Sequence, residues 1–231
     1  ASAGNRKTWT WAGWVKRSAL GTAQVIFSGV QNVSNGTLLR FDSTDKLEFF
    51  NYVAAAYSGR RISSSVYRDA SAWYHITLVW DSANGTVNNR IRLYVNGIEV
   101  TAFDITGDPS SSDSVINSTN SHYIGSDVGF NNQYFNGYLA DIHFIDGQAL
   151  TPSSFGQFDT NGVWQPIAYS GTYGTNGFHL PFSDNSAATA TTLGKDTSGN
   201  SNNWTPNNLS VTAGAGNDSL VDSPTNGTAS S

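Results

Sequence analysis

The 231-residue chain contains no cysteine and no methionine, and only two of its 17 acidic residues are glutamates. The lack of cysteine excludes a disulfide scaffold, a thiol nucleophile and a cysteine-ligated metal site. With two glutamates, four lysines and no methionine, strong helix formers are too scarce for a helical bundle. Because the chain starts with Ala1 and not with methionine, we expect a processed product or a part of a longer sequence.

Long apolar runs and a strong basic charge are also missing. No apolar run reaches the ~20 residues of a membrane-spanning helix, so we expect no membrane insertion. A net charge of -5 with 12 basic residues argues against a nucleic-acid partner, which requires a basic stripe. Aromatic residues are plentiful, with 7 Trp, 10 Tyr and 12 Phe, which is too many for a disordered chain. Ser, Thr, Asn and Gly supply 98 of the 231 residues, and this turn-rich composition predicts an all-β fold.

Alternating apolar residues predict antiparallel strands in the first two thirds of the chain. The clearest hairpin lies within 90–100, because Asn96-Gly97 between alternating stretches is typical of a type I′ turn. A second hairpin is predicted within 38–50. In 9–15 both faces of the strand carry bulky side chains, so we expect that strand to be covered on both sides.

The composition changes in the last third, where Gly and Asn dominate. We therefore divide the chain into a β-sandwich over 1–165 and a Gly/Asn/Ser-rich C-terminal extension over 166–231. Within the extension, 177–184 predicts one sheet-completing strand, and Pro181 places it at a sheet edge because proline removes a hydrogen-bond donor.

Five motifs follow one another in a recognisable order. They are TWTWAGWVK (8–16), WYHITLVWD (73–81), IRLYVNGIEV (91–100), HYIGS (122–126) and FNGYLADIHFIDGQALTPSSF (135–155). In this order they resemble the laminin-G-like, concanavalin A-like lectin/glucanase jelly rolls. The resemblance implies a two-sheet antiparallel β-sandwich, the fold class that the alternation of apolar residues also indicates. In this family a segment similar to 180–200 usually comes first and supplies the opening strand. The resemblance therefore implies that 177–184 pairs beside 9–16, either within the chain or in a neighbouring copy as strand donation.

Further segments resemble a subgroup of that family in tailed bacteriophages, especially marine ones. They are AGNRKTWTWAGWVKRS (3–18), FIDGQALTPSSFGQFDTNGVW (144–164), YGTNGFHLPFSD (173–184), GKDTSGNSNNWTPNNLSV (194–211) and DSPTNG (222–227). This resemblance implies a virion appendage or decoration protein, placed on the virion surface and outside the cell. Its partners would be other virion proteins, copies of itself and host-surface glycans.

Catalysis is not expected from these residues. The glucanase branch of the family uses two glutamates and an aspartate on one strand face, with one glutamate as nucleophile and the other as acid/base. The glutamates of this chain, Glu48 and Glu99, lie on different predicted strand pairs. None of the four histidines stands in a G-x-S-x-G context, which argues against Ser-His-Asp hydrolysis. We therefore predict no catalytic residue, no enzyme activity and no required cofactor.

Calcium is the one metal for which the sequence offers candidates, since many relatives bind it through Asp and Asn in loops. A hard cation needs several oxygen ligands at once. The candidate ligands are Asp42, Asp45, Asp127, Asp196 and Asn200. Asp and Asn are also frequent turn formers, and we favour that interpretation of these residues.

A carbohydrate site needs an aromatic platform and a few polar groups. One candidate is a loop containing Asp127, Phe130, Asn131, Asn132 and Tyr134. The other is the sheet face opposite the core, which would present His75, Thr77, Arg92, Tyr94, Asp141 and His143. For the sheet face we favour a surface covered by protein partners. For the loop, ligand binding and a purely structural role both stay open.

The function hypothesis is a non-catalytic phage virion protein that binds host-surface carbohydrate. One alternative is a secreted or cell-surface carbohydrate-binding module, which specific sugar binding by a monomer would favour. The other is a polysaccharide-cleaving enzyme, which would show two facing carboxylates in a groove.

Overall fold

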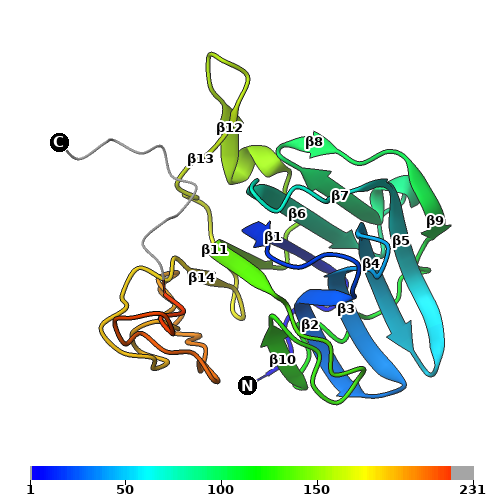
Figure 1. The fold of residues 1–231 in the computed structure, drawn as a ribbon. Coiled ribbons are helices and arrows are strands. Elements are labelled where there is room, and N and C mark those ends of the chain that lie inside the picture. Colours follow the sequence, from blue (N-terminus) through cyan, green and yellow to red (C-terminus); the bar gives the residue numbers. More distant parts are fainter. Residues whose placement is uncertain (1, 220–231) are drawn as a thin grey trace.

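Two antiparallel sheets packed face to face form the protein in the computed structural model, which describes residues 2–219 (Figure 1). From edge to edge, the first sheet contains β14 (Phe178–Leu180), β11 (Gly137–Asp146), β1 (Thr8–Arg17), β6 (Tyr74–Asp81), β7 (Ile91–Val95) and β8 (Ile98–Glu99). The second contains β10 (Ser121–Ile124), β2 (Gln24–Asn32), β3 (Asn35–Phe41), β4 (Lys46–Val53), β5 (Ala56–Val66) and β9 (Phe103–Gly107). The prediction of an all-β, two-sheet sandwich is confirmed.

Two smaller features complete the fold. β12 (Gly156–Phe158) and β13 (Trp164–Pro166) form a separate hairpin that projects from the sandwich at the top of Figure 1. Single 3-10 turns occur at Val87–Asn89 and Pro152–Ser154. No helix within the described residues is long and apolar enough to cross a bilayer.

Aromatic side chains fill the space between the sheets. Trp9 of β1 stacks on Trp80 of β6 with ring centroids 6.3 Å apart, and Phe49 of β4 meets Trp80 edge-on at 5.6 Å. All three side chains are fully buried. They come from strands in which every second residue points inward, and burying one such side chain contributes about 1.5–3 kcal/mol to folding. The apolar side chains at alternating positions of these strands therefore form the core of the sandwich.

The first strand, β1, is buried on both faces, as predicted. Trp9 and Trp11 lie in the core between the sheets. On the opposite face, Trp14 packs against Trp164, and Ala12 packs with Phe155. Both partners follow β11 in the chain. The segment after the last long strand therefore folds back over the outer face of the first sheet.

The predicted Asn96-Gly97 turn joins β7 to β8. Both residues have positive φ, 49° for Asn96 and 79° for Gly97, which confirms the type I′ prediction. A Cβ atom on Gly97 would lie 2.3 Å from the ring of Trp164. Glycine is therefore needed both for the turn and for the close approach of the covering segment.

β14 completes the first sheet within the same chain. It pairs antiparallel with β11 at the sheet edge, and Pro181 follows it directly. The prediction that it lies beside 9–16 is wrong, because β11 separates the two. The physical reason is length, since 10-residue β11 pairs along most of β1 whereas β14 has only 3 residues.

Beyond β14 the described chain contains no strand or helix, yet it packs on the sandwich. Trp204 lies 4.9 Å from Phe178 and 6.1 Å from Phe27, measured between ring centroids. This side chain covers one end of the core. The remainder of the predicted extension, 220–231, lies outside the described residues.

Candidate functional site

The loop between β10 and β11 carries the largest group of predicted site residues, and it folds against the outer face of the second sheet. Phe130 of the loop lies 6.0 Å from Phe50 and 5.8 Å from Tyr52, both on β4. Across β3, a Cβ atom on Gly36 would lie only 2.9 Å from the Phe130 ring. The sheet thus holds Phe130 in place and fixes the position of the whole loop.

Asp127 holds this loop together from inside. Its side chain is fully buried and accepts backbone hydrogen bonds from Asn131 and Gln133. Burial raises the pKa of the Asp127 carboxyl above its ordinary value. The structure therefore places this predicted ligand residue inside the loop, where its oxygens bind the loop's own N–H groups.

The remaining loop residues are accessible. Asn131 and Asn132 are exposed, and Tyr134 exposes 62% of its surface. Asn132 has a positive φ of 55°, and its side-chain oxygen accepts a hydrogen bond from the N–H of Gly129. The loop therefore offers two amides and an aromatic ring to solvent.

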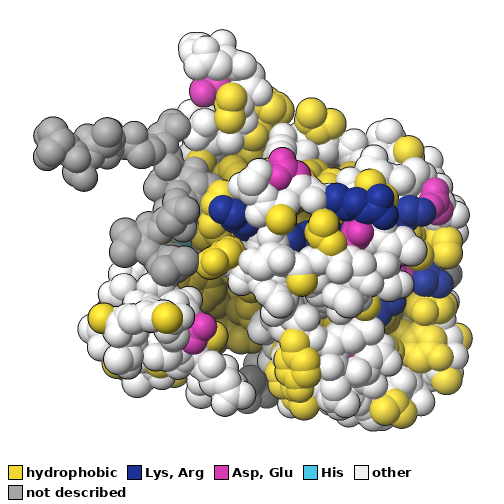
Figure 2. Space-filling model, viewed as in Figure 1, with side chains coloured by type: hydrophobic (Ala, Val, Ile, Leu, Met, Phe, Trp, Pro, Cys, Tyr) yellow, Lys and Arg dark blue, Asp and Glu magenta, His cyan; other side chains and the backbone are white. Residues whose placement is uncertain are grey.

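Beside the loop lies a group that we name the Arg–aromatic surface. It consists of Arg40 on β3, Phe50 and Tyr52 on β4, Tyr57 and Arg60 on β5, and Phe130 and Gln133 of the loop. On the right of Figure 2, over β4 and β5, Lys and Arg side chains lie next to hydrophobic ones. Apart from Phe130, sequence analysis missed these residues.

Its arginines are held by one buried carboxylate. Glu48 is fully buried and forms ion pairs with Arg40 and Arg60, each at 2.7 Å. Arg60 also lies over the ring of Tyr57, 4.3 Å from its centroid, while Arg40 donates to the Gln133 side chain at 2.9 Å. Two arginines against one glutamate leave a positive charge beside the exposed Tyr57 ring.

The outer face of the first sheet is covered rather than open. Sequence alternation correctly placed His75, Thr77, Arg92, Tyr94 and His143 on one face, as the strand register shows. Asp141 lies in a bulge without a register partner, and its carboxylate lies beside His143. His75 is only 1% exposed because Trp14 and Trp164 lie 5.1 and 5.8 Å away. Burial lowers the pKa of His75 to about 3. The chain's own segment after β11 thus covers the face that we expected protein partners to cover.

At the β14 edge of this face, two histidines and an aspartate come together. His143 and His179 are opposite residues of β11 and β14, and their rings stack with centroids 4.2 Å apart. The Asp141 carboxylate lies 2.7 Å from Nε2 of His179 and 3.4 Å from Nε2 of His143. Sequence analysis missed this cluster because β14 was assigned to another neighbour.

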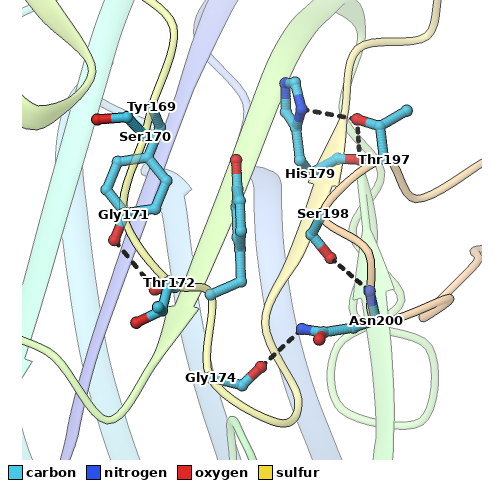
Figure 3. A pocket seen from close by; sticks show the side chains of 10 residues that line it. Tyr169, Ser170, Gly171, Thr172, Gly174, His179, Thr197, Ser198 and Asn200 are labelled. Atoms are coloured by element: carbon cyan, nitrogen blue, oxygen red, sulfur yellow. Dashed lines mark hydrogen bonds between the residues drawn. The ribbon is translucent and has the colours of Figure 1, made fainter.

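An open cavity of about 500 Å³ borders the cluster (Figure 3). Its walls are polar, with hydroxyl groups, amides and two tyrosine rings; they include Tyr169, Thr172, Tyr173, His179, Ser198 and Asn200. Burial lowers the pKa of His143. Burial also acts to raise the pKa of Asp141, but its hydrogen bonds to the two histidines hold that pKa well below the ordinary value.

The predicted calcium ligands do not converge within residues 2–219. Both carboxylate oxygens of Asp45 accept hydrogen bonds from arginines, Arg17 at 2.9 Å and Arg68 at 2.8 Å. The Asp42 carboxylate accepts hydrogen bonds from the N–H groups of Thr44 and Lys46 in its own turn. The carboxylate of the buried Asp196 accepts four hydrogen bonds, from His179, Ser198 and Asn202. Asn200 instead donates to the carbonyl oxygens of Gly174 and Gly177. In the part of the chain that the structure describes, each of these side chains forms a turn, an ion pair or hydrogen bonds to another segment of the protein.

The family model described as the concanavalin A-like lectin/glucanases superfamily, Laminin_G_3, matches residues 2–155. The chain belongs to this family. The match ends at Phe155, so the family region contributes Asp141 and His143 but not His179 or the cavity walls. No curated protein matches the chain.

Several solved structures are similar to this lectin/glucanase family member. A heptameric SAP-like pentraxin from Limulus polyphemus is 20% identical with a TM-score of 0.46, over 65% of this chain and 68% of that one. The IT-sialidase CBM40 of Ruminococcus gnavus bound to α2,3-sialyllactose is 13% identical with a TM-score of 0.48, over 66% and 91%. Domains LG4-5 of the mouse laminin α1 chain are 14% identical with a TM-score of 0.45, over 72% and 40%.

Proposed function

We propose that this lectin/glucanase family member is a non-catalytic carbohydrate-binding protein on the surface of a bacteriophage virion. The proposal for the binding site is the Arg–aromatic surface together with the exposed residues of the neighbouring loop. The observation that carries it is the Tyr57 ring, which is 50% exposed and lies beneath the Arg60 guanidinium.

The chemistry of this surface suits a sugar. The C–H face of a sugar ring packs on an aromatic ring, while amides and guanidinium groups bind its hydroxyl or carboxylate oxygens. Tyr57 supplies the ring, and Asn131 and Asn132 supply exposed amides at its side of the sandwich. The positive charge left by Arg40, Arg60 and Glu48 favours a glycan that carries carboxylates.

The absence of catalysis is part of the proposal. Glycosidases need two carboxyl groups that face each other across the scissile bond. Glu48 lies on β4 of the second sheet and is buried between Arg40 and Arg60 of the neighbouring strands. Glu99 lies on β8 of the first sheet. Two glutamates on different sheets do not form such a pair, which supports a binding role. The proposed contacts of the Arg–aromatic surface with a glycan use side chains alone and require no cofactor.

The virion role is supported by the five segments that resemble marine tailed-phage proteins, which extend from 3–18 to 222–227. We propose a tail appendage or decoration protein whose partners are other virion proteins and further copies of the same chain. Mass spectrometry of purified phage particles tests this placement. Recovery of the protein only as a free secreted monomer would instead favour a carbohydrate-binding module.

A glycan array with the purified chain tests the binding site. We expect binding to acidic glycans that falls at least about fivefold in Tyr57→Ala, since a well-packed aromatic contact contributes about 1 kcal/mol or more. Tyr138→Ala is the matched control, because Tyr138 is 42% exposed on β11 of the other sheet. Equal losses in both variants, or no glycan binding by the unaltered protein, would contradict the proposal.

A further inference from the structure

The Asp141–His143–His179 cluster lies on a different sheet from the Arg–aromatic surface, and nothing in the proposed glycan function uses it. Asp141 has a positive φ of 49°, and it falls where the register between β1 and β11 shifts. A positive φ is uncommon for a non-glycine residue within a strand and carries an energetic cost. This bulge is what places the Asp141 carboxylate against both imidazoles.

Three side chains of this cluster offer possible metal-ligand atoms close together. One ring nitrogen of each histidine and a carboxylate oxygen of Asp141 all lie within 4.8 Å of one another. Within the described residues, the ion pairs of Asp141 involve only these two histidines, and no lysine or arginine neutralises it. The planes of the two imidazoles differ by only 8° and their centroids lie 4.2 Å apart, so the Nε2 lone pairs lie in separate, nearly parallel planes. One ring must turn about its Cβ–Cγ bond for both histidines to bind a single ion.

We propose that Asp141, His143 and His179 bind one divalent transition-metal ion, with Zn²⁺ the ion that fits best. Imidazole nitrogens and one carboxylate oxygen suit Zn²⁺, whereas Ca²⁺ prefers an all-oxygen site. In a tetrahedral zinc site with bonds of about 2.0–2.1 Å, ligand atoms lie roughly 3.3 Å apart. The Asp141–His143 separation of 3.4 Å matches this value, and the Asp141–His179 separation of 2.7 Å needs to widen slightly.

Both imidazoles are also oriented from behind, as metal-binding histidines are. Nδ1 of His143 lies 2.9 Å from the Tyr173 hydroxyl, and Nδ1 of His179 lies 2.7 Å from Oγ1 of Thr197. When each Nδ1–H donates to its oxygen, each Nε2 keeps a lone pair for the metal. Tyr173 and Thr197 thus act as positioning residues for the two ligands.

The cluster leaves one coordination position open. The side chains of Asp141 and His179 are 33% and 23% exposed, and His179 borders the polar cavity of Figure 3. Three protein ligands with a fourth position open to solvent are typical of a reactive or exchangeable zinc site. A water molecule or an oxygen of a ligand in the cavity would occupy that position.

A bound ion would also connect two parts of the chain. Asp141 and His143 belong to the family-matched region, whereas His179 belongs to the C-terminal segment outside it. Because the unfolded chain cannot hold three such ligands together, Zn²⁺ would stabilise the docked position of β14.

Calorimetric titration of the metal-free full chain with ZnCl2 tests the site. We expect one Zn²⁺ per chain, a rise in Tm with added Zn²⁺, and affinity at least about tenfold weaker in Asp141→Asn and His179→Gln. The matched control is His122→Gln, which removes an imidazole from β10 of the other sheet. It should bind Zn²⁺ like the unaltered chain.

A crystal of the unaltered chain soaked in ZnCl2 avoids dependence on the folding of the variants. We expect an anomalous peak within bonding distance of the three ligand atoms. The proposal is overturned if the unaltered chain binds no Zn²⁺, if the peak lies elsewhere, or if well-folded cluster variants keep full affinity. Tyr57→Ala should bind Zn²⁺ like the unaltered chain, whether or not it loses glycan binding. The zinc proposal and the glycan proposal can therefore be rejected independently.

Discussion

At the scale of single residues, burial decides what each carboxylate does in this protein. Glu48 and Asp45 are both buried, and each binds two arginines. Removing a charge from water costs several kcal/mol unless an opposite charge and hydrogen bonds replace the lost hydration. These acidic residues are therefore parts of the sandwich, and the sequence alone does not distinguish them from ligand or catalytic carboxylates.

Asp45 should make the stability of the protein depend on acid. Burial raises its pKa, but hydrogen bonds from Arg68, Gly21 and Arg17 outweigh this effect and lower the pKa from 3.8 to about 2. Between these values the unfolded chain binds more protons than the folded one, so stability is fully present above pH 3.8 and falls as the pH drops towards 2. We expect a loss of roughly 1–2 kcal/mol, a figure reduced to allow for the exposure of Arg68.

Urea unfolding at pH 5, 4, 3 and 2 measures this dependence. Asp45→Asn should remove its share of the pH slope and also lower stability at pH 7, because Arg17 would stay buried without its counter-charge. The control is Asp104→Asn, which breaks the exposed pair with Lys46 and should cost less than about 1 kcal/mol. An unchanged slope in Asp45→Asn would contradict the assignment.

At the scale of secondary-structure elements, strands were predictable where local pattern and turn chemistry agree. The β7–β8 hairpin follows from alternation and from Asn96-Gly97, whose φ values are those that the turn requires. β5 escaped prediction because its sequence, AYSGRRISSSV, has little apolar alternation. It forms because β4 and β9 supply hydrogen-bonding partners on both sides. These partners are distant in the sequence, so no local pattern predicts them.

The β7–β8 turn offers a direct test of the close packing seen there. Gly97→Ala should destabilise the protein by about 2 kcal/mol or more, since φ is 79° and the new Cβ would lie 2.3 Å from the Trp164 ring. Gly85→Ala is the control, because a Cβ atom there has nothing within 4 Å. Thermal unfolding of both variants measures the difference, and equal midpoints would rule out the predicted clash.

At the scale of the whole molecule, the C-terminal segment is what closes the structure. It supplies β14 and returns to the core with Trp204, while Trp164, just before the division at residue 165, covers the outer face of β1. The division at residue 165 that composition suggested is therefore crossed by packing contacts. The fold places the His–Asp–His cluster and its cavity where the two parts meet.

If the two parts form one cooperative unit, Trp204→Ala should lower the stability of the entire sandwich by about 2 kcal/mol. The expected result is a single unfolding transition at lower temperature, with the same midpoint by circular dichroism and by fluorescence. Leu209→Ala is the control, since Leu209 is 47% exposed and should change stability by less than about 0.5 kcal/mol. A separate early transition with an unchanged main midpoint would show that the segment unfolds independently.

The sequence by itself determined the fold class, the clearest hairpin, the double burial of β1 and the residues that share the outer face of the first sheet. These follow from alternation and turn chemistry, which depend on residues close together in the chain. Only the tertiary structure decided that β14 pairs with β11, that His179 meets His143 and Asp141, and that Arg60 lies over Tyr57. Those contacts join residues on different strands, and strand order is chosen by the total packing of the sandwich and not by any local pattern.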